Sequence, residues 1–498
     1  MRAWNRTVAA ASAVTVAVGL LAAPGSAHAT PASRLAAYER QPLTWTACAG
    51  IDDPSLRCAT VRVPLDYTHP EARAITVTIS RLAAGDPARR RGVLLTTGGG
   101  PGGPGVPLPL QLRAGLDPAV LAAYDVVGFD IRFLERSTPI TCGQPAEEPG
   151  GFWVRSAAYQ SFKDTSAQAA ALAADCARNA GWALPFATTA NVARDMDVIR
   201  AVLGERKISY LGGSAAALVG VAYHTLFPDR VDRLVLDSPP DLDKVWRPFE
   251  LSRTAAMEDN YRAFLAFLAA GDATYHLGGT PAAVDAAITG VLRRATATPI
   301  VAGDHAWTAS ELGNLLVFAT FFEHLWQVVA IDFVSILSGA APPVPLPIQP
   351  AALPGTPGVP ADNHTAVNLA YRCGDHTWPR RSWSYRVMLA VHTARYPTYG
   401  PANANLNPCA FWPVGGDKTP SLSASRPGRA LILAALGDAA VPPANSVATH
   451  AAIRGSRLVT IDRRVHTPLL SGQADACMAG AVTAYLRDGV LPEANLAC

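Results

Sequence analysis

The chain has 498 residues, with 42 lysines and arginines against 39 acidic residues and a formal net charge of +3. This length is enough for one large domain with an insertion, or for two or three domains. The near balance of charge, without a basic stripe or an acidic tail, argues against nucleic acid as a partner.

The first residues have the pattern of a secretory signal peptide. Two arginines precede an apolar run at residues 8–23, and residues 27–29 (Ala-His-Ala) form a small-residue cleavage site. The alternative is a lone membrane anchor, but the helix-breaking Pro24-Gly25 follows the apolar run, and no later stretch is long and apolar enough to span a bilayer. We therefore expect residues 1–29 to be removed and the mature protein to be secreted, without a membrane attachment.

The eight cysteines favour disulfide bonds, since an even number of cysteines is typical of exported proteins. The sequence alone does not fix their pairing. The simplest expectation joins neighbours along the chain: Cys48–Cys58, Cys142–Cys176, Cys373–Cys409 and Cys477–Cys498. Structural zinc is the alternative, but neither a C-x-x-C pair nor an H-E-x-x-H motif is present, so we expect no metal and no cofactor.

Short apolar runs rich in β-branched residues predict strands that are buried on both faces. These runs lie at 74–80, 92–97, 125–130, 207–214, 233–237, 430–438 and 457–462. Helical patterns alternate with them at 166–180, 191–203, 216–227 and 475–486. Strands that alternate with helices predict an α/β fold with a mostly parallel sheet and helices on both faces.

The alternation is interrupted between about residues 240 and 371. Helical patterns at 249–269, 280–296 and 310–337 are followed by a proline-rich passage at 341–360. We interpret this stretch as a helical lid inserted into the sheet domain, because strands resume beyond it; a separate helical domain is the alternative. The expected organisation is a signal peptide at 1–29, the N-terminal part of the core at 30–240, the lid and its linker at 241–370, and the C-terminal part of the core at 371–498.

A serine flanked by small residues lies where a predicted strand meets a predicted helix. The stretch Gly212-Gly213-Ser214-Ala215-Ala216 has the form of a nucleophile elbow, the strained turn on which an α/β-hydrolase presents its serine. The usual pattern is G-x-S-x-G, and here alanine replaces the second glycine. The alternative role for Ser214 is a helix cap, which is common for a serine at the start of a helix.

A serine nucleophile needs a base, and the base needs an acid that orients it. In the α/β-hydrolase fold these residues follow in the order serine, acid, histidine. Asp438 and His466 each follow a predicted strand in that order, at strand ends where this architecture presents functional groups. Asp237, also at a strand end, is a second candidate acid. A loop aspartate and a packing or surface histidine are the alternative interpretations, since the chain has eleven histidines.

A glycine-rich segment at 97–105 follows the predicted strand 92–97. In α/β-hydrolases the loop after this strand and the residue after the nucleophile donate backbone N–H groups to the oxyanion. Those donors would be Gly100, or its neighbour Gly99, and Ala215. A phosphate-binding loop is the rival interpretation, but the pattern G-x-x-x-x-G-K-[ST] is absent. A second alternative is a loop that is flexible and has no binding role, but the position of this segment directly after a strand argues against it.

Together these segments resemble the secreted tripeptidyl aminopeptidases of actinomycetes, relatives of the proline iminopeptidases. The resemblance extends from about Trp45 to Cys498. It rests on the stretches 63–67 (Val-Pro-Leu-Asp-Tyr), 97–105, 126–130 with 132 and 136–139, 226–231, 235–237, 409–413 and 484–489. It implies an α/β-hydrolase fold with an inserted lid and a triad of Ser214, Asp438 and His466.

The chain departs from the pattern of this family in three places. The family's elbow reads G-x-S-Y-G-T, so the aromatic residue after the nucleophile is missing at Ala215, which should enlarge the pocket. Phe133 and Glu135 replace the glycines of the family's R-G-x-G-R stretch. His466 lies in R-V-H-T-P, whereas the family usually has glycine around it. We therefore expect the substrate preference to differ from that of the family more readily than the catalytic triad does.

We expect a secreted serine hydrolase that cleaves amide bonds through an acyl-enzyme and releases short peptides or single residues from a free N-terminus. An acidic residue of the lid would bind the substrate's ammonium group; the candidates are Glu258, Asp259, Glu323 and Asp332, each of which also suits a solvated helix face. Two alternatives are an ester or amide hydrolase acting on an acylated small molecule, and a ligand-binding or non-hydrolytic member of the fold.

Overall fold

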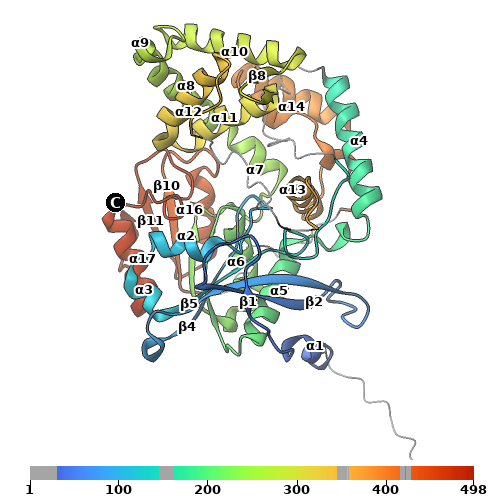
Figure 1. Cartoon of the computed structure of the whole chain (residues 1–498), viewed down its shortest axis with the longest axis vertical. Coiled ribbons are helices and arrows are strands. Elements are labelled where there is room, and N and C mark those ends of the chain that lie inside the picture. Colours follow the sequence, from blue (N-terminus) through green and yellow to red (C-terminus); the bar gives the residue numbers. More distant parts are fainter. Residues whose placement is uncertain (1–30, 145–160, 345–355, 357, 416–420, 422–427) are drawn as a thin grey trace, which may run out of the picture.

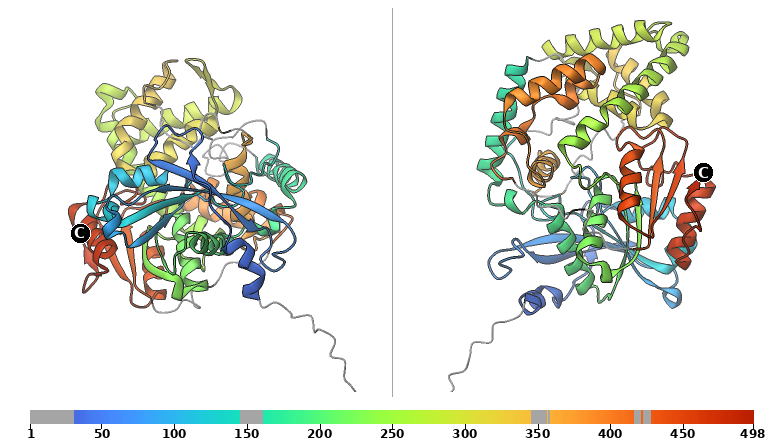
Figure 2. Two further views of the ribbon diagram at one scale, coloured as in Figure 1. Left: turned by 60° about the horizontal axis from the view of Figure 1, so that its bottom comes forward. Right: turned by 180° about the vertical axis from the view of Figure 1, so that it is seen from behind.

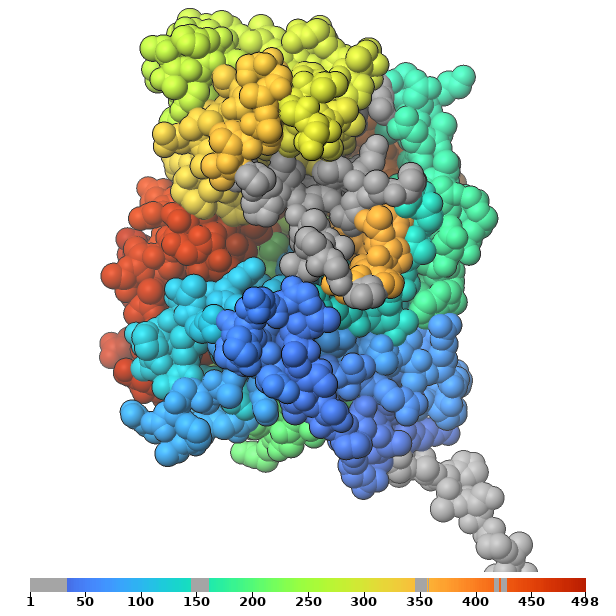
Figure 3. Space-filling view, in the orientation of Figure 1, coloured from blue at the N-terminus to red at the C-terminus, as the bar shows by residue number. Residues whose placement is uncertain are grey.

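A computed structural model describes residues 31–144, 161–344, 356, 358–415, 421 and 428–498. The expected signal peptide and most of the proline-rich passage lie outside these residues. Figure 1 shows a twisted sheet flanked by helices in its lower half and a layer of helices above it. The space-filling view in Figure 3 shows the first strands and α2 and α3, in blue and cyan, below this helical layer, in yellow.

Within the described residues the main sheet has ten strands in the order β1-β2-β3-β5-β4-β6-β7-β10-β11-β12. The strands are β1 Thr46–Ala47, β2 Leu56–Pro64, β3 Ala74–Leu82, β4 Gly92–Thr96, β5 Tyr124–Phe129, β6 Ile208–Gly213, β7 Val231–Asp237, β10 Ala430–Ala435, β11 Arg457–Ile461 and β12 Leu496–Ala497. Neighbours from β5 through β12 are parallel, whereas β1, β2, β3 and β5 join antiparallel. This mostly parallel sheet confirms the predicted α/β-hydrolase fold.

The seven strands predicted from apolar runs are all present. Every residue of β4, β5, β6 and β10 is buried, which explains why these strands read as continuous apolar stretches. Apolar patterning did not predict β2, because buried and exposed residues alternate along this antiparallel strand. The two-residue strands β1 and β12 are too short to give a pattern.

Helices cover both faces of the sheet, as expected, because successive side chains of a strand point to opposite faces. Leu94 of β4 packs on the side of α2 Leu108–Gly115, α3 Pro118–Ala123 and α17 Ala476–Asp488. Val93 and Leu95 pack on the opposite side, with α5 Thr189–Val202 and α6 Ala215–Leu226. Figure 2 shows these two sides of the sheet. The remaining helices of this part are α1 Pro31–Glu39 and α16 Pro443–Ala452, whereas α4 Phe162–Ala180 lies beside the helical layer (Figure 1).

The helical layer has a hydrophobic core of its own. The elements of this layer are α7 Arg247–Ser252, α8 Thr254–Ala270, α9 Asp272–Tyr275, α10 Pro281–Ala297, α11 Ala309–Phe321, α12 Trp326–Leu337 and the hairpin β8 Ile300–Ala302 with β9 His305–Trp307. The helices predicted at 249–269 and 310–337 are each broken in two. The second break occurs because Phe322 leaves the helical conformation and forms a β-bridge with Val465 of the C-terminal part.

Helices continue beyond residue 370, where the sequence interpretation placed the end of the lid. The chain forms α13 Asn363–Gly374, α14 Ser382–Arg395 and α15 Gly400–Ala404 before the sheet resumes at β10. The expected boundary therefore falls inside α13. This helix is largely buried, and Val367 and Ala370 belong to the same hydrophobic core as Val93 and Leu95 of β4. None of the helices in the described ranges combines the length and apolar character needed to cross a bilayer.

The cysteines, all of which lie in the described residues, form four disulfide bonds. The pairs are Cys48–Cys58, Cys142–Cys176, Cys373–Cys409 and Cys477–Cys498, as predicted from pairing of neighbours. Two of these bonds connect segments next to the helical layer. Cys142–Cys176 links the loop after β5 to α4, and Cys373–Cys409 links α13 to the segment that precedes β10.

Candidate active site

Ser214 occupies a strained turn between β6 and α6. Its backbone has φ 57° and ψ −128°, a conformation that L residues rarely adopt, and its N–H donates to the carbonyl of Asp237 at 2.9 Å. A Cβ on Gly212 would lie 2.6 Å from the Tyr210 ring and 2.9 Å from the carbonyl oxygen of Ala216, so only glycine fits there. Ser214 makes no capping hydrogen bond to α6, which leaves its hydroxyl available for other contacts. The turn has the geometry of a nucleophile elbow.

His466 is held in place by a buried carboxylate and by the helical layer. Its Nδ1 lies 2.9 Å from Oδ2 of Asp438, which is 1% exposed. The other oxygen of Asp438 accepts the N–H groups of Ala440 and Val441, both at 2.9 Å. The backbone N–H of His466 donates to the carbonyl of Phe321 at 2.9 Å. With Nδ1 engaged by Asp438, the Nε2 atom is the one left to accept a proton.

Ser214 and His466 line the same cavity, which has a volume of about 320 Å³. The two loops that carry them touch: a Cβ on Gly213 would lie 2.9 Å from Cγ2 of Thr467. Asp438 lies behind His466. The structure thus brings together the serine, histidine and aspartate that the sequence singled out.

Asp237, the second candidate acid, supports this site from a different position. Its Oδ2 accepts the N–H of Leu470 at 2.9 Å, and its carbonyl accepts from Ser214. Burial, together with a smaller contribution from the nearby carboxylate of Asp438, raises the pKa of the Asp237 carboxyl to about 7. The hydrogen bond of the His466 ring goes to Asp438, so Asp237 braces the backbone of the serine and histidine loops.

The glycine-rich loop after β4 closes the cavity above the serine. A Cβ on Gly99 would lie 3.3 Å from Cβ of Ser214, and Gly100 has φ +117°, which favours glycine. Gly99, Gly100 and Ala215 all line the cavity. The backbone positions expected to donate to an oxyanion therefore border the space in front of Ser214. β4 is also where the strand order reverses, the place at which open α/β sheets bind ligands.

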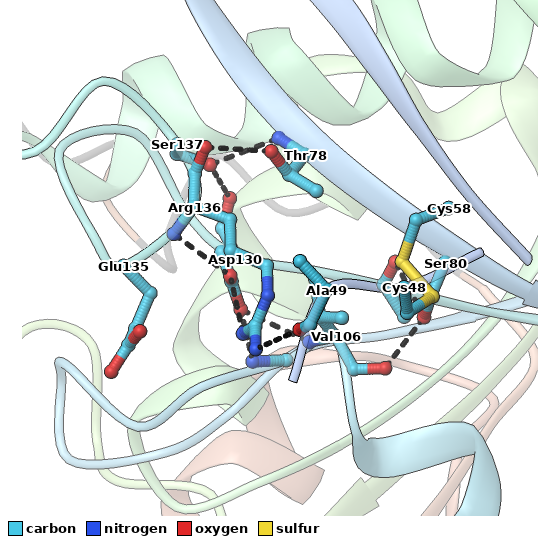
Figure 4. A network of polar contacts seen from close by, with 12 residues as sticks. Cys48, Ala49, Cys58, Thr78, Ser80, Val106, Asp130, Glu135, Arg136 and Ser137 are labelled. Carbon is cyan, nitrogen blue, oxygen red and sulfur yellow. Dashed lines mark hydrogen bonds and ion pairs between the residues drawn. A yellow bond between two sulfur atoms is a disulfide. The ribbon is translucent and has the colours of Figure 1, made fainter. Parts of the chain in front are cut away.

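Asp130, at the end of β5, anchors the far end of this loop. Its Oδ1 accepts the N–H groups of Gly105 and Val106 at 2.8 and 3.0 Å. Its carbonyl accepts from the hydroxyl of Ser137, and the guanidinium of Arg136 lies 3.9 Å from its Oδ2 (Figure 4). Burial raises the pKa of Asp130 to about 6. These hydrogen bonds attach the glycine-rich loop to the sheet and so hold its backbone in one conformation beside Ser214.

Comparison with known proteins places this architecture in a family. Residues 93–278 match the family model "alpha/beta hydrolase fold", and residues 396–498 match the model "TAP-like protein". The tripeptidyl aminopeptidase of Streptomyces lividans is 33% identical over 92% of this chain and 87% of its own length. The chain belongs to the tripeptidyl aminopeptidase family. The resemblance drawn from the motifs is thereby confirmed, and the chain is a serine peptidase of the α/β-hydrolase type.

Two more distant relatives cover as much of the chain. The serine protease Hip1 of Mycobacterium tuberculosis is 27% identical over 92% of this chain and 91% of its own length. A protein named carboxylesterase B from the same organism is 28% identical over 95% of this chain and 92% of its own length. The similarity therefore covers both the sheet domain and the helical layer.

The two residues that replace the family's glycines lie in backbone conformations suited to glycine. Phe133 has φ 74° and Glu135 has φ 47°. Each makes a contact that glycine lacks: Phe133 packs edge-on against Trp182, and the fully buried Glu135 pairs with His364 of α13. Sequence reasoning found the substitutions but missed the Glu135–His364 pair, because its members are 229 positions apart.

The four acidic residues considered as anchors for a substrate ammonium group lie elsewhere. Glu258 accepts the backbone N–H groups of two residues before α15, and Asp332 accepts that of Val344. Asp259 and Glu323 form exposed ion pairs with neighbouring arginines. Within the described part of the chain, no aspartate or glutamate lines the cavity. The cavity instead contains Arg253, which the sequence did not single out because no motif marks it.

Proposed function

We propose that this chain is a secreted exopeptidase that uses Ser214 as nucleophile, His466 as base and Asp438 as the acid that orients it, and that releases short peptides from a free N-terminus. The observation that carries the proposal is the shared cavity of Ser214 and His466, with the His466 ring held by Asp438 at 2.9 Å. The name of the Streptomyces relative supports an N-terminal tripeptide as the released product.

The chemistry follows from the positions of these groups. Ser214 Oγ attacks the scissile carbonyl carbon while His466 Nε2 takes the hydroxyl proton. The resulting oxyanion receives the N–H groups of Gly100 and Ala215. When the C–N bond breaks, His466 returns the proton to the leaving amine and Ser214 retains the acyl group as an ester. Water, deprotonated by His466, then hydrolyses this ester and regenerates the serine.

The helical layer serves as a lid over this chemistry in our proposal. Trp246, Phe249 and Arg253 line the cavity from the start of the layer, and Phe321 lines it from the end of α11. A roof of this kind limits the length of chain that reaches Ser214, which suits an exopeptidase. It also excludes water and so strengthens the polar contacts at the serine.

Secretion is supported by two independent features. Four disulfide bonds within the described residues are typical of an oxidising compartment, and the first 29 residues have the pattern of a signal peptide. N-terminal sequencing of the protein recovered from culture medium tests this part directly. We expect the mature chain to begin at Thr30; recovery from the cytoplasm with residue 1 intact would contradict it.

A digest of defined peptides tests the activity. Peptides of four to eight residues are incubated with the wild type and with Ser214→Ala, each peptide with a free and with an acetylated N-terminus, and products are identified by mass spectrometry. We expect N-terminal di- or tripeptides from the free peptides, loss of that release on acetylation, and no products with Ser214→Ala. Equal cleavage of acetylated peptides would refute the aminopeptidase, and cleavage only of acyl esters in a parallel arm would favour the esterase alternative.

A further inference from the structure

The cavity in front of Ser214 has an apolar wall and a cation beside it. Trp246, Phe249 and Phe321 form part of its wall, and Arg253 lines it between α7 and α8. The guanidinium carbon of Arg253 lies 5.8 Å from the ring centres of both Phe249 and Phe321, and the residue is only 2% exposed. A charge in such apolar surroundings acts more strongly on a ligand than the same charge in water.

The charged groups near Arg253 include Glu250 and Asp438. Glu250 forms an ion pair with Arg253, with its Oε2 3.9 Å from Nε of Arg253. Glu250 is shared, because its other oxygen pairs with Arg372. Asp438 also acts on Arg253 through space, but its oxygens are engaged by His466 and two backbone N–H groups. Burial lowers the pKa of Arg253 to about 10, which keeps the side chain protonated at neutral pH.

We propose that Arg253 determines specificity by binding a carboxylate that the substrate carries next to the scissile amide. This inference rests on the proposed function of Ser214. The cavity residues named above bring a guanidinium, and no acidic side chain within the described ranges, to the wall around the nucleophile. A substrate carboxylate there gains a charge-assisted hydrogen bond beside apolar side chains, whereas an ammonium group would meet a like charge.

The proposal is compatible with a free N-terminus on the substrate. In a released tripeptide three residues separate the ammonium group from the scissile bond, a distance of roughly 10 Å along an extended chain. The carboxylate bound by Arg253 has two sources: an acidic side chain at the residue whose carbonyl is attacked, or the free C-terminal carboxylate of a one-residue leaving group. Both present the same chemistry to the guanidinium.

Two matched substrate pairs separate these sources. Ala-Ala-Glu and Ala-Ala-Gln aminomethylcoumarin amides differ only in the charge of the side chain before the scissile bond. Tetra-alanine with a free C-terminus and the same peptide as its C-terminal amide differ only in the leaving group. The values of kcat/KM are measured for the wild type, Arg253→Gln and Arg253→Lys, with Arg262→Gln as control, since Arg262 is an exposed arginine of α8.

We expect the wild type to prefer the carboxylate member of at least one pair by about 10- to 100-fold, the range expected for a hydrogen bond to a charged group. Arg253→Gln should abolish this ratio, Arg253→Lys should retain part of it, and Arg262→Gln should leave it unchanged. A merely structural role for Arg253 would lower all rates together and keep the ratio.

The wild-type ratios test the proposal even if Arg253→Gln fails to fold. Cleavage of both members of both pairs at equal rates, or a preference for the uncharged members, would overturn it. That outcome differs from failure of the proposed function, in which no substrate is cleaved and Ser214 is not labelled by an active-site phosphonate. A ratio that persists in folded Arg253→Gln would also overturn the assignment.

Discussion

Replacement of Asp438 by asparagine tests the account of the His466 ring with a change of one atom. In the wild type, one oxygen of Asp438 accepts the N–H groups of Ala440 and Val441 and the other faces Nδ1 of His466. In Asp438→Asn the amide oxygen must stay on the two backbone donors. The amide NH₂ then faces His466, so that Nδ1 becomes an acceptor and Nε2 carries the proton. A histidine in this tautomer cannot accept the proton of Ser214.

The size of the effect follows from these hydrogen bonds. Turning the amide so that its oxygen faces His466 breaks two backbone hydrogen bonds, at about 1 kcal/mol or more each. A cost of about 2–3 kcal/mol leaves the competent arrangement at a few per cent or less. The variant also lacks the carboxylate charge that stabilises the protonated imidazole. We therefore expect kcat to fall by about 10³- to 10⁴-fold, with KM nearly unchanged.

The assay is the initial rate of hydrolysis of a peptide amide at pH 7.5, together with a thermal melt of each protein. Asp237→Asn is the matched control, because it makes the same chemical change at a buried aspartate beside the serine loop. We expect this control to keep kcat within about tenfold of the wild type, since its amide oxygen can still accept from Leu470. The reasoning would be refuted if Asp438→Asn retained a tenth of the wild-type kcat, or if the kcat of the control fell as far as that of Asp438→Asn.

Three further predictions follow from the same contacts. Gly99→Ala should reduce kcat by about 10²-fold or more without a large change in melting temperature, because its methyl group would press on the Cβ of Ser214 and displace the oxyanion loop; an unaltered kcat would contradict this. Burial raises the pKa of Asp237 from 3.8 to about 7, so the folded state loses up to about 4 kcal/mol relative to the unfolded state as the pH rises from about 4 to 7. The unfolding free energy of Asp237→Asn relative to that of the wild type should therefore increase from pH 5 to pH 8, as measured by urea unfolding. The same difference between the two proteins at both pH values would count against the raised pKa. Removal of the Cys373–Cys409 bond by serine at both positions should lower the unfolding free energy by about 2–4 kcal/mol, and unchanged urea midpoints would argue that α13 is held by packing alone.

The sheet and the candidate triad were predictable because their signals are local. A buried parallel strand reads as an apolar run, and the loops that follow such runs meet at one edge of the sheet. The same reasoning selected Ser214, Asp438 and His466, which the structure brings to one place and whose catalytic roles are the proposal made above. It was not sufficient for β2, whose alternating pattern resembles that of many exposed segments.

The features that sequence reasoning missed depend on contacts between distant parts of the chain. The helix expected at 310–337 breaks because Phe322 bridges to Val465, and neither residue signals this by itself. Glu258 was considered as a substrate anchor for its charge, but it serves as an acceptor for backbone N–H groups 140 and 141 positions away. Arg253 lines the cavity because it lies at the break between α7 and α8, and no sequence motif predicts this position.

Labelling with a fluorophosphonate tests the central claim most directly, because such a reagent reacts only with a serine activated by a correctly placed base. Wild type, Ser214→Ala and His466→Ala are treated with the reagent, and the modified peptide is identified by mass spectrometry. The account predicts a single adduct on Ser214 of the wild type and none in either variant. A folded wild-type protein that is not labelled, or that is labelled on another serine, would contradict it.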